Sequence, residues 1–191
     1  MHRLFVAIRP PQPVRARLRD VMGGVSGARW MTDDQLHLTL RFIGEVEAHV
    51  AEDVAAALAG VRHPPFRIAL SRIGSFERRG HPEVLWAGVT PHDELKALHK
   101  KVDQACQRAD LPPEGRAYSP HITLARLKRD TGSIAALMET SGGLSSEPFA
   151  VDSFCLSDSQ LTPEGALYTI VARYRLAKAP RRRRNRSTIP A

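Results

Sequence analysis

Two short stretches of the sequence each place a histidine and a threonine two residues apart. The stretch "HLTL" contains His37 and Thr39, and the stretch "HITL" contains His121 and Thr123. Because the ordinary pKa of histidine is about 6.5, one imidazole can accept a proton near neutral pH while another donates one. A threonine hydroxyl can donate a hydrogen bond to a phosphate oxygen.

This set of side chains suits displacement at the phosphorus atom of a phosphodiester. In-line displacement places the attacking and the leaving oxygen on opposite sides of the phosphorus. Two histidines that face each other across a groove can therefore act as base and acid, while each threonine holds a non-bridging oxygen. We expect neither a metal nor a cofactor, since the mechanism needs none and the sequence has no H-E-x-x-H or G-x-x-x-x-G-K-[ST] motif.

Each motif lies in a segment that alternates as a β-strand does, 35–43 for the first and 120–127 for the second. Side chains alternate between the two faces of a strand. The histidine and threonine of one motif therefore share a face, and the residues between them point into a hydrophobic core. The same alternation places Arg41 on the face of His37.

Strands and helices alternate along the whole sequence. We predict strands at 3–10, 28–31, 35–43, 66–74, 84–90, 120–127, 149–160 and 167–177. We predict helices at 13–22, 46–61, 92–111 and 132–140, and a loop at 75–83. Each motif strand lies between two helices, so we infer a duplicated α/β unit with one motif per lobe. Polar and apolar alternation in the strands favours largely antiparallel sheets with one open face.

The composition fits one domain without a membrane partner. Of the 191 residues 42% are hydrophobic, no apolar run approaches the ~20 residues of a membrane helix, and the N-terminal apolar stretch is too short for a secretory signal. Cys106 and Cys155 form no C-x-x-C pair, so we expect buried free thiols. We expect a monomer in the cytoplasm.

The C-terminal end carries most of the net charge of +8. Residues 178–191 hold six basic residues and no acidic one, and the rest of the chain has 22 basic against 20 acidic residues. We therefore predict a single domain at 1–177 and a disordered basic tail at 178–191. Such a tail adds unspecific attraction to phosphates.

The two motifs, one in each half, resemble the paired signature of the two-histidine phosphoesterase superfamily. With their flanks, "RLFVAI", "HLTLRFIGEV" and "SPHITLAR", they resemble the bacterial and archaeal RNA 2′,3′-cyclic phosphodiesterases, also called 2′-5′ RNA ligases, over residues 3–175. The resemblance implies an α+β fold of two pseudo-twofold-related lobes, with antiparallel sheets lining a central cleft and helices outside. It implies hydrolysis of terminal 2′,3′-cyclic phosphates of RNA, such as tRNA fragments, to 2′-phosphomonoesters. Whether 2′-5′ ligation accompanies hydrolysis stays open.

The resemblance also assigns roles to the motif residues. His37 matches the proton donor, which protonates the departing 3′-oxygen, and His121 matches the proton acceptor, which activates water. Thr39 and Thr123 match the hydroxyls that hold the phosphate.

Two further residues follow from the resemblance. Arg126 matches a basic residue near the phosphate, and Phe42 matches an aromatic residue that can stack on a base. Strict alternation from His121 places Arg126 on the opposite face, so it reaches the cleft only if the strand ends, twists or bulges after Leu124. Arg41 is the competing candidate, since it is in phase with the first motif.

Two other functions remain open. The same cleft can act on a small substrate, such as a cyclic nucleotide or an ADP-ribose cyclic phosphate, or the chain can be a non-catalytic module that binds RNA ends. Two complete His-x-Thr motifs argue against the module, because Arg or Lys serves plain phosphate binding better. Arg78 and Arg79 in the predicted loop can contact an RNA backbone or lie in solvent.

Overall fold

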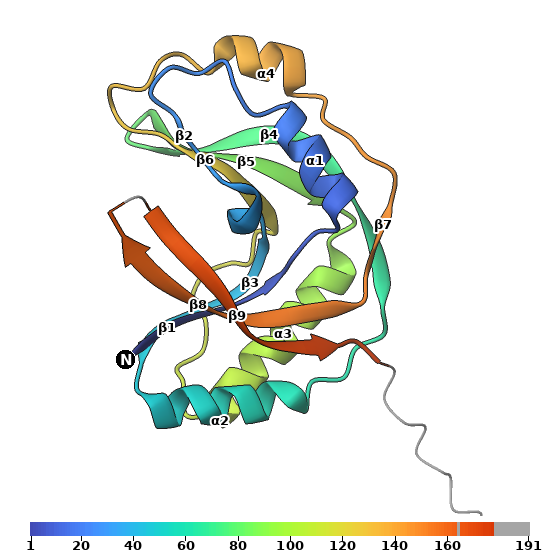
Figure 1. Ribbon diagram of the computed structural model, residues 1–191. Helices are drawn as coiled ribbons and strands as arrows, with labels where there is room; N and C mark the ends of the chain where they lie inside the picture. The colour runs from blue at the N-terminus through green and yellow to red at the C-terminus, as the bar shows by residue number, and fades with distance from the viewer. Residues whose placement is uncertain (164, 178–191) are drawn as a thin grey trace, which may run out of the picture.

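The computed structural model describes residues 1–163 and 165–177, through which a curled antiparallel sheet runs (Figure 1). Its strands are β1 (His2–Ile8), β2 (Arg29–Trp30), β3 (Leu38–Val46), β4 (Phe66–Arg78), β5 (His81–Thr90), β6 (His121–Arg126), β7 (Phe149–Val151), β8 (Ser153–Thr162) and β9 (Gly165–Arg175). The helices are α1 (Gln12–Asp20), α2 (Ala48–Ala59), α3 (Asp93–Arg108) and α4 (Ala135–Ser141), with a 3₁₀ helix, η1 (Asp33–Gln35). The predicted basic tail, 178–191, lies outside the described residues.

The strand order divides the sheet into two lobes. The order is β7-β4-β5-β6-β3-β1-β8-β9, β2 pairs with β6, and every pairing is antiparallel. The β3 lobe contains β3, β1, β8 and β9, and the β6 lobe contains β6, β5, β4 and β7. Each lobe holds one motif, as predicted, but each combines strands from both halves of the sequence. The halves interleave because β5 pairs with β6 and β1 pairs with β8.

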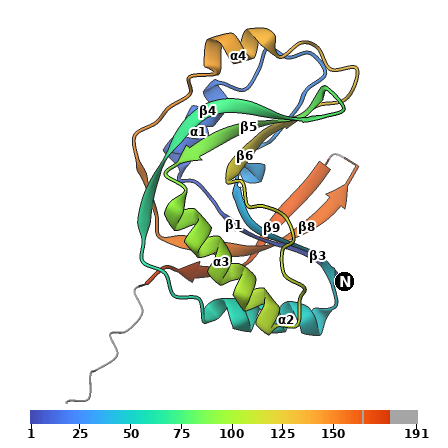
Figure 2. The ribbon, with the colours of Figure 1, turned by 180° about the vertical axis from the view of Figure 1, so that it is seen from behind.

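The helices cover the outer faces of the lobes (Figures 1 and 2). Helices α2 and α3 pack against each other, α3 packs on β3, and α4 packs on β4. The core-facing stripe of α3 has the 3–4-residue spacing of an amphipathic helix, and its members Leu95, Leu98, Val102 and Ala105 are fully buried. Asp93 and Glu94 in its first turn favour the positive end of the helix dipole. The predicted α+β fold with antiparallel strands and outer helices is confirmed.

One predicted boundary is wrong, since the loop expected at 75–83 is a β-hairpin. Strand β4 continues to Arg78 and β5 begins at His81, so the turn contains only Arg79 and Gly80, with φ angles of 52° and 77°. Two residues with positive φ are typical of a tight hairpin turn. The hairpin tip is exposed, so its strands carry the polar residues that are usual in loops.

Two further predictions concern the cysteines and the helices. Cys106 and Cys155 are buried free thiols, as the sequence predicts. Within the described residues no helix is long and apolar enough to cross a membrane.

Candidate active site

The two motif strands are direct neighbours at the centre of the sheet. Leu38 of β3 pairs with Ile122 of β6 in an antiparallel register. Continued by one residue each way, this register places His37 opposite Thr123 and Thr39 opposite His121. Opposite residues in such a pair have Cα atoms about 4.5–5.5 Å apart, so the four side chains meet on one face.

That face forms the floor of a cleft of about 730 Å³. All four motif residues line it, and so do the two other predicted site residues, Phe42 and Arg126. Among the described residues that line the cleft there is no carboxylate, but there are four arginines: Arg3, Arg29, Arg116 and Arg126. A concave site with charge of one sign attracts ligands of the opposite charge, so this cleft suits a polyanion.

A β-bulge in each motif strand decides which residue follows the motif into the cleft. The pairing of β3 with β1 slips between Thr39 and Arg41, and the pairing of β6 with β5 slips between Thr123 and Ala125. The extra residue is therefore the last leucine of each motif. A bulge reverses the alternation, so Phe42 and Arg126 return to the cleft face. Arg126 was expected to reach the cleft only if the strand ended, twisted or bulged, and the bulge at Leu124 meets this condition.

The same bulge turns Arg41 away from the cleft, so the placement that alternation predicted for it is wrong. Arg41 is only 7% exposed. Its Nη1 donates to Oε2 of Glu114 at 2.7 Å and its Nη2 donates to the carbonyl of Pro112 at 2.6 Å. Its Nε lies 3.2 Å from Oδ1 of Asp103 on α3. Arg41 therefore ties β3 to α3 and the following loop.

Both histidines are held in the same way by their own chain. The Nδ1 atom of His37 lies 2.6 Å from the carbonyl oxygen of Gln35, and that of His121 lies 2.8 Å from the carbonyl oxygen of Ser119. A carbonyl only accepts hydrogen bonds, so Nδ1 carries the hydrogen in each ring. The Nε2 atom of each histidine is then the nitrogen that is left to accept or donate a proton.

Burial lowers the pKa of both histidines. It lowers the pKa of His37 to about 4, against the opposing effect of the Gln35 carbonyl and with smaller contributions from the positive charges of His121 and Arg126. Burial likewise lowers the pKa of His121, opposed by the hydrogen bond to Ser119. Both rings are therefore neutral at pH 7. A bound anion raises both pKa values, because it favours the imidazolium form.

Aromatic side chains fix the planes of the two rings. Phe5 and Tyr168 contact His37 at centroid distances of 4.8 and 5.2 Å. Phe76 meets His121 edge-on at 4.8 Å and itself rests on Trp86. The sequence pattern did not identify these residues as part of the site. Phe76 fell in the predicted loop, and Tyr168 comes from a strand far along the chain.

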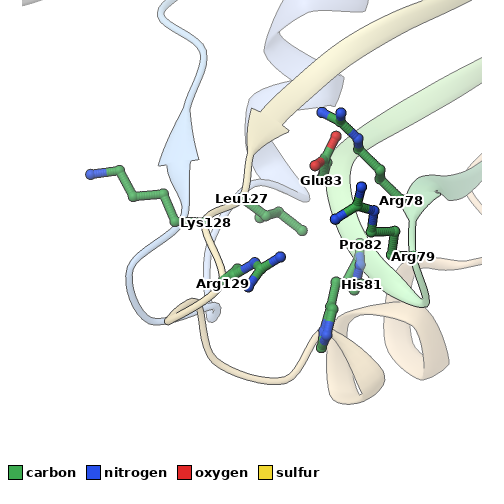
Figure 3. A pocket seen from close by; sticks show the side chains of 8 residues that line it. All are labelled: Arg78, Arg79, His81, Pro82, Glu83, Leu127, Lys128 and Arg129. Atoms are coloured by element: carbon green, nitrogen blue, oxygen red, sulfur yellow. The ribbon is translucent and has the colours of Figure 1, made fainter.

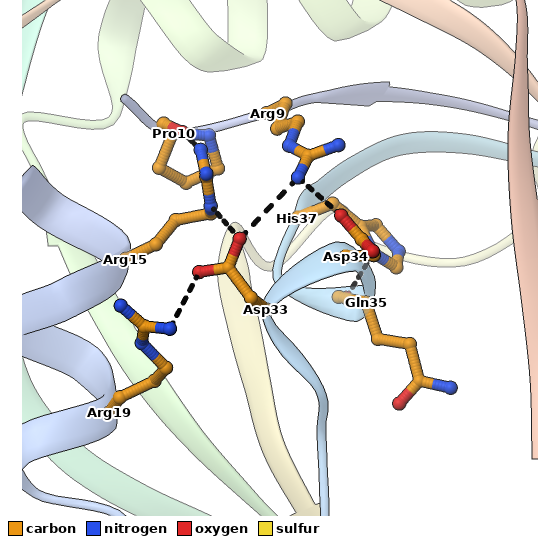
Figure 4. Close-up of polar contacts among 8 residues, drawn as sticks. All are labelled: Arg9, Pro10, Arg15, Arg19, Asp33, Asp34, Gln35 and His37. Carbon is orange, nitrogen blue, oxygen red and sulfur yellow. Dashed lines mark hydrogen bonds and ion pairs between the residues drawn. The ribbon is translucent and has the colours of Figure 1, made fainter. Parts of the chain in front are cut away.

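A cluster of charges holds the 3₁₀ helix that presents the carbonyl of Gln35 (Figure 4). Asp33 accepts a 2.9 Å hydrogen bond from Nε of Arg15 and lies 3.5 Å from both Arg9 and Arg19. The neighbouring Asp34 accepts one from Arg9 at 2.7 Å. These contacts anchor η1, and through it they orient the ring of His37.

Gln35 also joins this helix to the rest of the cleft. Its Oε1 accepts from the backbone N–H of Thr32, which completes a capping box, and its Nε2 donates to the carbonyl of Ala166 at 2.7 Å. The sequence "TDDQ" carries the capping signature, so η1 was detectable. Its contact with β9 was not, because that contact joins residues far apart in the chain.

Comparisons with known proteins agree with this geometry. A family model for the 2′-5′ RNA ligase superfamily matches residues 9–162. The chain is 34% identical over 171 residues to the RNA 2′,3′-cyclic phosphodiesterase of Aeropyrum pernix, which covers 87% of this chain and 97% of that protein. The crystal structure of TT0787 from Thermus thermophilus superposes with a TM-score of 0.74 and 27% identity, covering 92% of this chain and 98% of that one. The crystal structure of E. coli LigT complexed with 3′-AMP gives 0.73 and 26%, covering 93% and 99%.

Proposed function

Because the chain belongs to the 2′-5′ RNA ligase superfamily, we propose that it is an RNA 2′,3′-cyclic phosphodiesterase. It opens a terminal 2′,3′-cyclic phosphate of RNA and leaves a 2′-phosphomonoester. One observation carries the proposal: two histidines from opposite lobes, each held through Nδ1 by a backbone carbonyl, line one cationic cleft.

The reaction needs one proton taken and one proton given. The Nε2 atom of His121 accepts a proton from water, and the water oxygen forms a bond to phosphorus. The bond from phosphorus to the 3′-oxygen breaks, and His37 protonates that oxygen. The 2′-oxygen keeps the phosphate, so the product is a 2′-phosphomonoester.

The charge of the substrate prepares His37 for the donor role. Its pKa of about 4 leaves the ring neutral at pH 7 before a substrate binds. A bound phosphodiester anion raises this pKa and also neutralises Arg126, one of the charges that lowers it. Substrate binding therefore favours the protonated form of His37, which supplies the proton that the leaving oxygen requires.

The remaining residues hold the substrate. The hydroxyls of Thr39 and Thr123 each donate to a non-bridging oxygen, and the guanidinium of Arg126 pairs with the same phosphate. Phe42 is 49% exposed at the edge of the cleft, and the guanidinium of Arg3 lies 5.5 Å from its ring centroid. This ring offers a surface on which the terminal base can stack.

The charge of the cleft favours RNA over a small nucleotide. Four arginines line it, which is more positive charge than one cyclic phosphate needs. A small cyclic nucleotide remains the second candidate, since LigT of E. coli was crystallised with 3′-AMP. A module that only binds RNA ends has no use for two histidines held by matching carbonyl contacts.

Product identification tests this function. Purified protein in EDTA is mixed with an oligoribonucleotide that ends in a 2′,3′-cyclic phosphate, and the product is resolved against 2′- and 3′-phosphate standards. We expect the 2′-phosphate at an unchanged rate, because among the described residues no three His, Cys, Asp or Glu side chains gather as metal ligands. A 3′-phosphate product or loss of activity in EDTA contradicts the mechanism.

The proposed function also bears on ligation, on the extent of the catalytic domain and on the cellular compartment. An RNA 5′-hydroxyl that replaces water as the attacking group gives a 2′-5′ phosphodiester, so ligation uses the same side chains. We expect residues 1–177 to act as a monomeric catalytic domain on RNA ends such as those of tRNA fragments. An RNA substrate and two free thiols fit the cytoplasm.

A further inference from the structure

A second pocket of about 500 Å³ lies where the tip of the β4–β5 hairpin meets the segment after β6 (Figure 3). It is lined by Arg78, Arg79, His81, Pro82, Glu83, Leu127, Lys128 and Arg129. We propose that this pocket binds backbone phosphates of the RNA on the 5′ side of the cyclic end. This inference rests on the proposed function and specifies its substrate as an oligonucleotide.

The pocket continues the catalytic cleft along the two strands on either side of β5. On β4, Phe76 contacts the ring of His121, and Arg78 follows two residues later on the same face. On the other side, the N–H of Leu127 donates to the carbonyl of Glu83 at 2.9 Å, so the chain after Arg126 stays beside β5. At about 3.3 Å per residue, the pocket begins at Leu127, roughly 13 Å along the chain from Thr123 in the phosphate site. An extended dinucleotide can span that distance.

The charge of the pocket suits a phosphate backbone. Four of its residues are permanently cationic and only Glu83 is acidic. Residues 1–163 and 165–177 contain six arginine–carboxylate ion pairs and two histidine–carboxylate contacts, and none of them involves these four cations. The side chains of Arg79 and Arg129 point into the pocket in Figure 3, whereas Lys128 points away. Arginine pairs with phosphate oxygens through two parallel hydrogen bonds.

The hairpin turn gives an independent reason to assign a role to Arg79. Its φ of 52° lies in the left-handed region, which tight hairpin turns normally fill with Gly, Asn or Asp. An arginine is less stable there than an asparagine. Positions at which a residue opposes its local backbone preference are often functional. A phosphate contact explains why this turn carries a long cationic side chain.

The test compares two substrates in one double variant. The variant Arg79→Asn/Arg129→Gln is assayed with adenosine 2′,3′-cyclic phosphate and with a tetraribonucleotide that ends in a 2′,3′-cyclic phosphate. We expect kcat/KM for the tetranucleotide to fall about tenfold, as for the removal of one or two charged hydrogen bonds, and the value for the mononucleotide to stay within about twofold. The matched control, Arg17→Gln/Arg108→Gln, removes the same charge from exposed positions on α1 and α3 and leaves both values unchanged.

The salt dependence of tetranucleotide binding and the thermal stability of the variants provide two further measurements. The slope of log Kd against log salt for the tetranucleotide should decrease by about 0.7 for each phosphate of the single strand that the variant no longer neutralises. The melting temperature of Arg79→Asn should equal or exceed that of the wild type, because asparagine suits the turn. Arg129→Gln alone provides a variant that leaves the turn untouched.

The two substrates separate failure of the inference from failure of the function. Equal losses on both substrates, or no loss on the tetranucleotide, overturn the role of the pocket. If the wild type hydrolyses neither substrate, the proposed function fails, and fluorescence anisotropy with a labelled tetranucleotide 3′-phosphate still tests the pocket. Roughly tenfold weaker binding by the double variant supports it, and unchanged binding overturns it.

Discussion

Leu38 and Ile122 face each other in the ladder that joins β3 to β6, and this pair links the β3 lobe to the β6 lobe. Both side chains are fully buried, so the adjacent motif residues must point the other way, into the cleft. A shift of one residue in this register would turn one motif into the core. The pairing of two apolar residues therefore sets the relation of the two motif histidines.

Replacing either histidine should abolish most turnover. His37→Ala and His121→Ala should each lower kcat at least ~100-fold on a cyclic-phosphate oligonucleotide, because each removes one proton-transfer group. Binding of the 2′-phosphate product, followed by anisotropy, should change little. The control His49→Ala changes an exposed residue on α2 and should leave kcat unchanged. Full activity in either motif variant would end the acid–base assignment.

The choice of leaving group should distinguish donor from acceptor. Bis(p-nitrophenyl) phosphate releases a stable phenolate, which needs no proton from a general acid. On this diester His37→Ala should lose much less activity than His121→Ala, if His37 protonates the leaving oxygen. The reverse order would exchange the two roles. The measurement is the release of p-nitrophenol by both variants and the wild type at one pH.

The pH dependence of kcat/KM should show an acidic optimum. The free protein is competent when His37 is protonated and His121 is neutral, and this form is a constant fraction of the singly protonated pair. Burial lowers both pKa values below 6.5, that of His37 to about 4, so this form is most populated between pH 4 and 6.5. We expect kcat/KM to decrease as pH rises above about 6.5. An optimum above pH 7.5 would contradict the burial effect.

Stability should depend on pH through the same histidine. The unfolded chain binds a proton near pH 6.5 but folded His37 binds one only near pH 4, so stability decreases as pH falls from 6.5 to 4. A shift of this size corresponds to at most about 3–4 kcal/mol, and solvent screening reduces it. Urea unfolding at pH 7 and pH 4.5 should show a larger loss for the wild type than for His37→Gln. Equal losses would show that His37 is solvated in the folded protein.

The two arginines that compete for the cleft should have opposite phenotypes. Arg126→Gln should raise KM about tenfold and leave the melting temperature unchanged, since Arg126 is exposed, lines the cleft and takes part in none of the ion pairs of the described residues. Arg41→Gln should lower stability by about 2–3 kcal/mol, because it leaves Asp103 and Glu114 without their buried partner. Thermal unfolding and kcat/KM, measured on both variants, check this difference. A kinetic defect in folded Arg41→Gln with wild-type stability would contradict the structure.

Asp33 should act as a positioning residue for His37. Asp33→Ala removes the anchor of η1 and lets the carbonyl of Gln35 move, so kcat should fall about tenfold with little change in KM. Asp33→Glu, which can keep the contact to Arg15, should recover part of the rate. A purely structural role would lower stability but leave kcat unchanged at a temperature where the variant is folded.

The sequence by itself determined which face of its strand each motif residue occupies, and it determined the fold class. Alternation with a period of two is a local property of a strand, so it correctly paired each histidine with its threonine and buried the residues between them. The order of helices and strands predicted the α+β fold with outer helices. These features depend only on neighbouring residues, and the printed sequence contains them.

Only the tertiary structure decided which other side chains share the cleft. The bulge at Leu40 arises from pairing with β1, and it turns Arg41 away from the cleft. The bulge at Leu124 arises from pairing with β5, and it places Arg126 in the cleft. The contact of His37 with Tyr168 comes from a strand about 130 residues away, and the burial that lowers its pKa also depends on packing that the local sequence does not show. Such effects depend on long-range pairing and desolvation, which local periodicity does not encode.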